Sequence, residues 1–164
     1  MMNPDQIDTF IQLLQKHELV IAALYDKFGD LCPESKKAWQ GFAAEERRHA
    51  RWIGALQTHL DSKTVSFEQT RMTIQSATIA IEYIERQIES IEETQIDLKK
   101  ALIIALDIEK SLLESAFFKV FKLGGPKADS IRSRLMEATE AHIKRLIDWQ
   151  KEVNRVRSVD FNAH

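Results

Sequence analysis

Five ionisable side chains occupy positions where helical periodicity requires apolar residues. In residues 41–52, GFAAEERRHARW, Glu46 and His49 interrupt an apolar stripe that continues through Phe42 and Ile53. Residues three apart on a helix lie on the same face, so this carboxylate and this imidazole can reach one point. Three more residues interrupt the stripes of other segments in the same way: Glu18, Glu109 and His142. Carboxylates and imidazoles are ligands of iron, manganese and zinc, so the five residues together predict a metal site.

The cost of burial favours a metal over a purely structural role. An inward carboxylate without a counter-charge costs several kcal/mol. The basic residues that could supply one fall off the stripes: Arg47, Arg48, Lys110 and Lys144. A divalent cation would satisfy all five groups at once. Taken singly, Glu18 or Glu109 would instead lie at the edge of a stripe and reach solvent, and each histidine would be a hydrogen-bonded core residue.

The composition and the helix start and end signals predict that helices alone position these residues. The chain has 164 residues, of which 44% are hydrophobic, five are glycine and three are proline. Asn3-Pro4 is typical of a helix start, Gly29 of a helix end, and the GGP run at 124–126 of a strong break. The spacing in TQID, residues 94–97, is that of a capping box. We therefore expect five helices, at 4–29, 33–61, 66–93, 95–123 and 127–157.

Each expected helix carries one apolar stripe at intervals of three and four residues, which is typical of one buried face. Helices longer than the usual three turns favour a bundle. The stripe of 66–93 has no polar interruption, whereas each of the other four is interrupted near its middle. We expect a single all-α domain over residues 1–164, with four helices around a common centre and 66–93 as an additional crossover helix.

Charge and cysteine usage exclude several classes of function. The formal net charge is −2, with no basic stripe of the kind that binds nucleic acid. The single cysteine, Cys32, cannot form an internal disulfide framework or a four-cysteine metal knuckle. The N-terminal segment is amphipathic, and no apolar run approaches the roughly 18 residues of a membrane span. We expect a soluble, cytoplasmic protein that binds neither nucleic acid nor membrane.

Four short motifs, in order along the chain, resemble those of rubrerythrins, which belong to the ferritin-like di-iron carboxylate superfamily. They are ELVIAALY at 18–25, FAAEERRHA at 42–50, ALDIEKSLLESAFF at 105–118 and EATEAHIKRL at 137–146. The resemblance covers nearly the whole chain and implies a ferritin-like four-helix bundle with a crossover helix. It also implies metal ligation by Glu18, Glu46, His49, Glu109 and His142, with Glu46 and Glu109 as the bridging carboxylates. Tyr25 would then be a neighbour of the ligands or a one-electron donor, although a packed core role also fits it.

Two departures from the rubrerythrin pattern affect the metal count. Thr139 stands where the last motif would have glutamate, and Leu112 stands where the third motif would have a second glutamate. Glu140 lies about 160° from His142 around the helix and cannot replace residue 139. Three carboxylates and two imidazoles remain, which is few for two metals with full coordination, so a mixed or singly occupied site stays open. Manganese and zinc also suit these ligands.

The resemblance implies an oxidoreductase that reduces peroxide or oxidises Fe(II), as a homodimer. The four-cysteine rubredoxin domain of full-length rubrerythrins is absent from this sequence, so turnover would require an external electron donor. Two alternatives stay open at this point. The chain could bind or store metal without turnover, which the missing glutamate at 139 favours, or it could be a metal-free helical interaction module.

Overall fold

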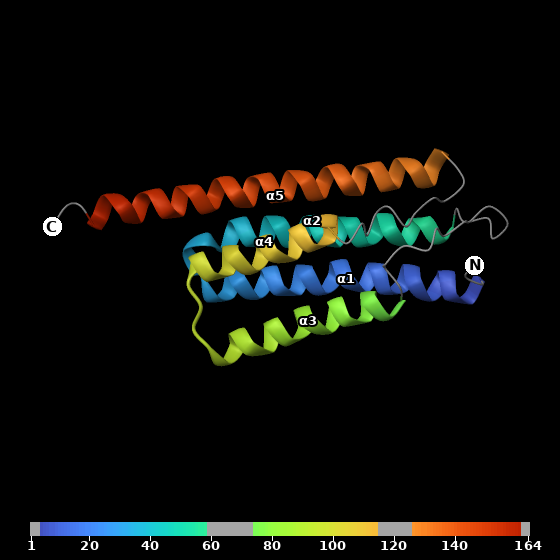
Figure 1. The fold of residues 1–164 in the computed structure, drawn as a ribbon, viewed down its shortest axis with the longest axis horizontal. Coiled ribbons are helices and arrows are strands. Elements are labelled where there is room, and N and C mark those ends of the chain that lie inside the picture. The colour runs from blue at the N-terminus through green and yellow to red at the C-terminus, as the bar shows by residue number, and fades with distance from the viewer. Residues whose placement is uncertain (1–3, 59–73, 115–125, 162–164) are drawn as a thin grey trace.

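The computed structural model describes residues 4–58, 74–114 and 126–161, which are helical apart from short turns and contain no strand (Figure 1). The elements are α1 (Pro4–Leu31), a short 3-10 turn (Pro33–Ser35), α2 (Lys36–Gln57), α3 (Ile74–Glu93), α4 (Leu98–Glu114) and α5 (Pro126–Phe161). The prediction of an all-α chain with five helices is confirmed for these residues. The predicted helical stretches at 59–61, 66–73 and 115–123 lie outside them.

Gly29 does not end the first helix as predicted, because α1 continues to Leu31. A Cβ atom added at Gly29 would lie 3.5 Å from the Cβ of Trp39 on α2. This glycine therefore lies where two helices approach closely, and it remains helical. At the other end of the chain, α5 continues to Phe161, four residues beyond its predicted end at 157.

The start of α4 also differs from the capping box predicted at 94–97. Asp97 is the capping residue, since its Oδ1 accepts a hydrogen bond from the Lys100 backbone amide at 2.9 Å. The Thr94 hydroxyl instead donates to the Ser90 carbonyl oxygen at 2.8 Å, which closes the preceding helix. As a result α4 begins at Leu98.

Four of the helices form a ring. Contacts join α1 to α2, α2 to α5, α5 to α4 and, more sparsely, α4 to α1, so these four helices surround a shared interior. α3 makes its principal contacts with α1 and lies on the outer side of that helix (Figure 1). It runs back along the bundle, so α2 and α4 point in the same direction. This arrangement agrees with the crossover role predicted for residues 66–93.

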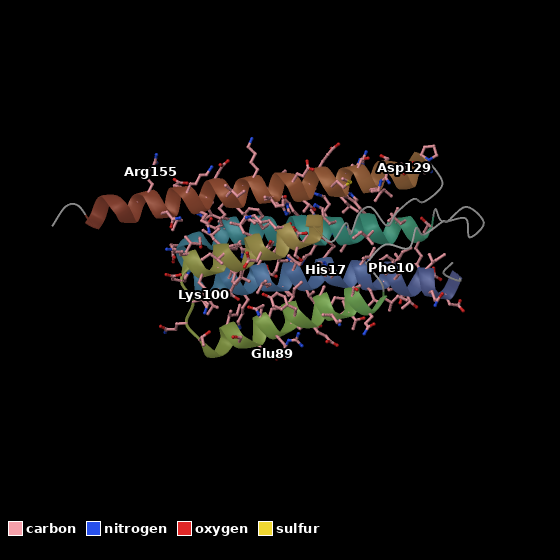
Figure 2. All side chains as sticks on the ribbon, viewed as in Figure 1. Phe10, His17, Glu89, Lys100, Asp129 and Arg155 are labelled. Atoms are coloured by element: carbon pink, nitrogen blue, oxygen red, sulfur yellow. The ribbon has the colours of Figure 1, made fainter. Side chains whose placement is uncertain are left out.

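Side chains from the four helices fill the interior along the length of the molecule (Figure 2). The largest fully buried ones come from α1 and α2: Phe10, Ile11, Leu14, Ile21, Leu24, Tyr25, Phe28, Trp39, Ile53 and Leu56. Burying a side chain of this size stabilises the fold by about 1.5–3 kcal/mol. These predicted stripes supply the rigid frame that holds the interrupting polar residues. Among the described helices, none combines the length and the apolar character needed to cross a membrane.

Candidate metal centre

The five residues singled out by the sequence are all buried, and the fold brings them together from four helices. Glu18 lies on α1, Glu46 and His49 on α2, Glu109 on α4 and His142 on α5. Each is at most 2% exposed. The simpler interpretation of Glu18 and Glu109 as solvent-reaching residues at stripe edges is therefore wrong.

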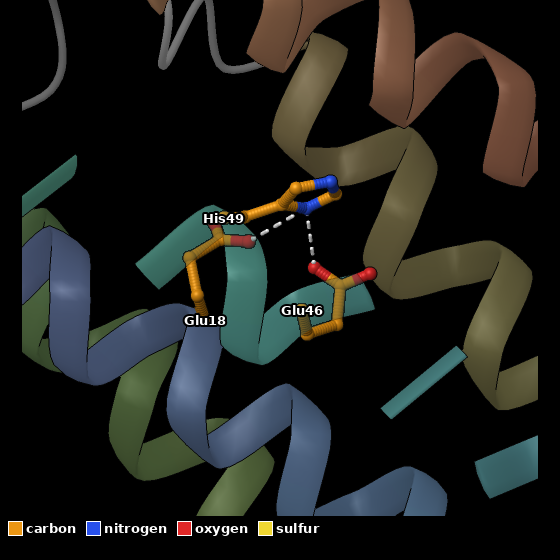
Figure 3. A group of neighbouring side chains, drawn as sticks. All are labelled: Glu18, Glu46 and His49. Atoms are coloured by element: carbon orange, nitrogen blue, oxygen red, sulfur yellow. Dashed lines mark hydrogen bonds and ion pairs between the residues drawn. The ribbon is translucent and has the colours of Figure 1, made fainter. Parts of the chain in front are cut away.

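The first group consists of Glu18, Glu46 and His49, and its side chains point toward one another (Figure 3). His49 Nδ1 lies 2.9 Å from Glu46 Oε2 and 3.5 Å from Glu18 Oε2. All three residues project from the α1–α2 pair, which forms the most extensively packed pair of helices in the described structure.

The second group consists of Glu46, Glu109 and His142. His142 Nδ1 lies 2.6 Å from Glu46 Oε1 and 3.4 Å from Glu109 Oε1. Glu46 thus directs one carboxylate oxygen to each histidine, and it belongs to both groups. The bridging role expected for Glu46 stays a prediction. Glu109, the other residue expected to bridge, belongs to the second group and not to the first.

The donor atoms of each group could hold a metal ion. Within each group they all lie within 4.8 Å of one another. Around an ion with bonds of about 2.0–2.2 Å, neighbouring ligand atoms lie roughly 3 Å apart, which the observed separations of 2.6–3.5 Å bracket. His49 Nε2 is buried without a hydrogen-bond partner among the described residues. Buried polar atoms are normally paired. Glu46 and Glu18, the ion-pair partners of His49, both contact its Nδ1 atom.

Without a metal, protons balance the charge of the cluster. Burial opposes ionisation of the histidines, but hydrogen bonds to glutamates raise the pKa of His49 to about 9 and that of His142 to about 10. Burial and the charge of Glu109 raise the pKa of Glu46 to about 7. The pKa of Glu18 is lowered: burial opposes this, but nearby imidazoles outweigh it. Two imidazolium ions can therefore take the place of a metal as counter-charge.

Tyr25 contacts the cluster through its hydroxyl group, which donates a 2.7 Å hydrogen bond to Glu109 Oε1. Burial, together with the charge of Glu109, raises the pKa of Tyr25 well above its usual range, so the phenol remains neutral. Its ring lies against Trp39 and Phe42, with centroid separations of 5.4 and 5.9 Å. Tyr25 is therefore a packed core residue that also contacts a candidate ligand, and the one-electron donor role stays a prediction.

The departure at residue 139 is visible in the structure. Thr139 is buried on α5, three residues before His142, so it faces the interior where a further carboxylate would stand. Glu140 is exposed, as its helical position requires. The side chain of Leu112, the other departure, lies outside the described residues.

Glu45 is a functional candidate that sequence reasoning missed. It accepts a short hydrogen bond from His142 Nε2, the ring nitrogen that points away from the cluster. Arg145 donates two hydrogen bonds to the same carboxylate, of 3.0 and 2.6 Å. Burial opposes ionisation, but the contacts with Arg145 and His142 lower the pKa of Glu45 to about 2. A carboxylate on the distal nitrogen is the usual partner of a metal-ligating histidine.

His17 is a second polar residue beside the cluster, and it is buried. Its Nδ1 lies 3.8 Å from Glu18 Oε1, beyond hydrogen-bond distance but close enough to influence that carboxylate. The only sequence signals for His17 and Glu45 are their positions directly before Glu18 and Glu46.

Replacing Glu45 with glutamine is expected to weaken metal binding by about 10–100-fold without abolishing it. The amide can no longer anchor the imidazole as an anion, so Nδ1 is less firmly directed toward Glu46 and Glu109. Competition with a chromophoric chelator measures the affinity, and Glu82→Gln, at an exposed position on α3, is the matched control. Equal affinities in the wild type and Glu45→Gln would contradict the orienting role.

Searches against protein-family models, curated proteins and solved structures returned no match for this chain.

Proposed function

We propose that this chain is a rubrerythrin-like metalloprotein of the ferritin-like type, which binds iron and reduces peroxide or oxidises Fe(II). One observation carries the proposal: Glu46 directs one oxygen to each of two buried Glu/His groups built from four helices. A carboxylate shared in this way would hold two metal ions close together. The ring of α1, α2, α5 and α4 with an outlying α3 supports the same fold assignment.

The protein's part in the reaction follows from the contacts of these residues. An iron pair, if bound, would supply two electrons to one O–O bond. Glu18 with His49 would hold one metal position and Glu109 with His142 the other, and Glu46 would be shared by both. Tyr25 orients Glu109, and Glu45 with Arg145 orients His142. Burial of the whole cluster excludes bulk water. An external donor restores the two electrons.

Metal binding without turnover is the second candidate, and Thr139 favours it. Each group reaches two carboxylates and one imidazole only by counting the shared Glu46. Two metal ions would therefore have five protein ligands between them, and Thr139 adds no further carboxylate. Redox cycling by a pair requires both positions to be filled, so partial occupancy would leave a binding protein.

Metal content and peroxide consumption distinguish these functions. Protein purified from iron-rich medium is expected to contain one to two metal ions per chain by elemental analysis. When loaded with Fe(II), it is expected to consume peroxide faster than the same concentration of free iron. Bound metal with peroxide consumption at background would favour the second candidate. A chain without bound iron, manganese or zinc would overturn both and leave a metal-free helical module.

The stability of the metal-free protein is expected to fall as the pH rises from about 7 to about 10. The folded-state pKa values of His49 and His142, about 9 and 10, exceed the ordinary value of 6.5. The folded chain therefore binds more protons than the unfolded chain, and the stability this contributes is lost as pH rises through those values. The pKa of Glu46 is raised from 4.5 to about 7, so its contribution to stability is also lost as the pH rises, but at lower pH than that of the histidines.

Metal should reverse this trend, because it displaces the protons that the histidines carry. Thermal melts with chelator and with metal, taken between pH 6 and 10, should therefore diverge as the pH rises. Glu18 does not disturb the comparison, since its lowered pKa affects stability only in acid. Chelated protein whose stability is constant across this range would contradict the proton-balanced cluster.

A further inference from the structure

A cleft of about 420 Å³ lies between α1, α3 and α4, outside the ring of four helices. Its wall includes His17 from α1, Ala80, Tyr83 and Arg86 from α3, and Asp107 and Ile108 from α4. Tyr83 and Arg86 are exposed at its rim, whereas His17 is buried (Figure 2 labels His17 midway along the bundle). The cleft therefore extends from the surface to a buried imidazole.

The inner wall of the cleft adjoins the candidate metal centre. The imidazole of His17, only 2% exposed, separates the cleft from Glu18, with its Nδ1 3.8 Å from Glu18 Oε1. Ile108, which also lines the cleft, directly precedes Glu109 in α4. The pair α1–α4 makes the least contact of the four pairs that form the ring. The cleft thus lies where α1 and α4 are least closely packed, and its lining includes the sequence neighbours of Glu18 and Glu109.

We propose that this cleft is the route by which hydrogen peroxide reaches the metal centre, with His17 as the side chain that closes its inner end. The inference rests on the proposed function. The five candidate ligands are at most 2% exposed, so an oxidant needs a path from solvent. Two other pockets, one near Cys32 and one near Pro126, contain no residue adjacent in sequence to any of the five.

The lining favours a small neutral molecule. Its walls are largely apolar, with Ala80, Ile84 and Ile108 among them. The two ionic side chains, Arg86 and Asp107, are exposed and of opposite sign, so they provide no net field for an ion. A cation would lose water in this largely apolar space and would meet Arg86 as well as Asp107, whereas peroxide carries no charge. At the reduced centre, peroxide would accept two electrons and two protons as its O–O bond breaks, giving two waters, and the external donor would replace the electrons.

Filling the cleft tests the route. Ala80→Trp places an indole against the cleft wall, and Ala38→Trp is the matched control on an exposed position of α2 away from it. Anaerobic Fe(II)-loaded protein is mixed with nitric oxide, a small neutral probe that binds ferrous iron, and binding is followed by absorbance and electron paramagnetic resonance. Ala80→Trp is expected to retain its iron and to slow nitric oxide binding and peroxide consumption at least tenfold. Ala38→Trp should match the wild type.

Opening the inner end provides a second, opposite test that does not depend on a bulky substitution. His17→Ala is expected to retain iron and to accelerate nitric oxide binding several-fold. Equal binding rates in the wild type and in either folded, iron-loaded variant would overturn the route while leaving the metal centre intact. A wild-type chain that binds no iron would overturn the proposed function and this inference with it, so the two failures are distinguishable.

Discussion

Glu46→Gln is expected to remove metal binding at both groups while the metal-free protein keeps its stability. Glu46 supplies an oxygen to His49 on one side and to His142 on the other. Its pKa is raised to about 7, chiefly by burial and by the charge of Glu109, so the folded protein gains little from its ionised form. The amide removes the bridging anion but preserves the size of the side chain. Loss of a residue that only hydrogen-bonds a ligand, such as Glu45, lowers metal affinity by up to about 100-fold. Loss of Glu46, a candidate ligand itself, should lower the affinity by more than this.

The control for this substitution is Glu140→Gln, which removes an exposed carboxylate from α5. Both variants are compared with the wild type by elemental analysis and by thermal melts with and without chelator. If Glu46 were instead a structural ion-pair partner, its loss would leave buried imidazolium ions unpaired and cost roughly 3–5 kcal/mol without any link to metal. A strongly destabilised Glu46→Gln alongside a chelator-insensitive wild type would therefore exclude a metal centre.

Thr139→Glu is expected to destabilise the metal-free protein and to strengthen metal binding in the second group. Thr139 is buried and shares the inward face of α5 with His142. The two imidazolium ions already balance the carboxylates present, so a further anion has no counter-charge in the absence of metal. Its burial should cost about 3 kcal/mol, which lowers Tm by roughly 6–12 °C in a domain of this size. Bound metal should recover most of this loss.

Thr139→Gln is the matched control, because glutamine has the length of glutamate but no charge. The decisive measurement is the rise in Tm on adding iron, which should be larger for Thr139→Glu than for either the wild type or Thr139→Gln. Metal stoichiometry should also approach two per chain. A Thr139→Glu protein whose Tm rises no more with iron than that of Thr139→Gln would show that residue 139 does not face a metal position.

The sequence by itself determined the all-α class and the five inward residues of the candidate metal centre. Stripes at intervals of three and four fix which face of each helix is buried, because apolar side chains must leave water together. The interruptions at Glu18, Glu46, Glu109 and His142 are therefore visible before any contact is known, and all four proved buried. The helix starts were less accurate, as at Asp97, since a cap depends on which of several nearby polar groups reaches the free amides.

The tertiary structure alone decided which of these residues meet. Periodicity places a residue on a face but carries no information about the partner across the interior, so the sharing of Glu46 between His49 and His142 could not be read from spacing. The same limit hid Glu45, whose partners His142 and Arg145 lie almost a hundred positions away. Glu45 is off its stripe and half-buried, and only the packing of α5 against α2 turns an apparently solvated carboxylate into the group that orients a candidate ligand. Contacts between distant segments depend on how helices pack, and that geometry is a property of the whole fold.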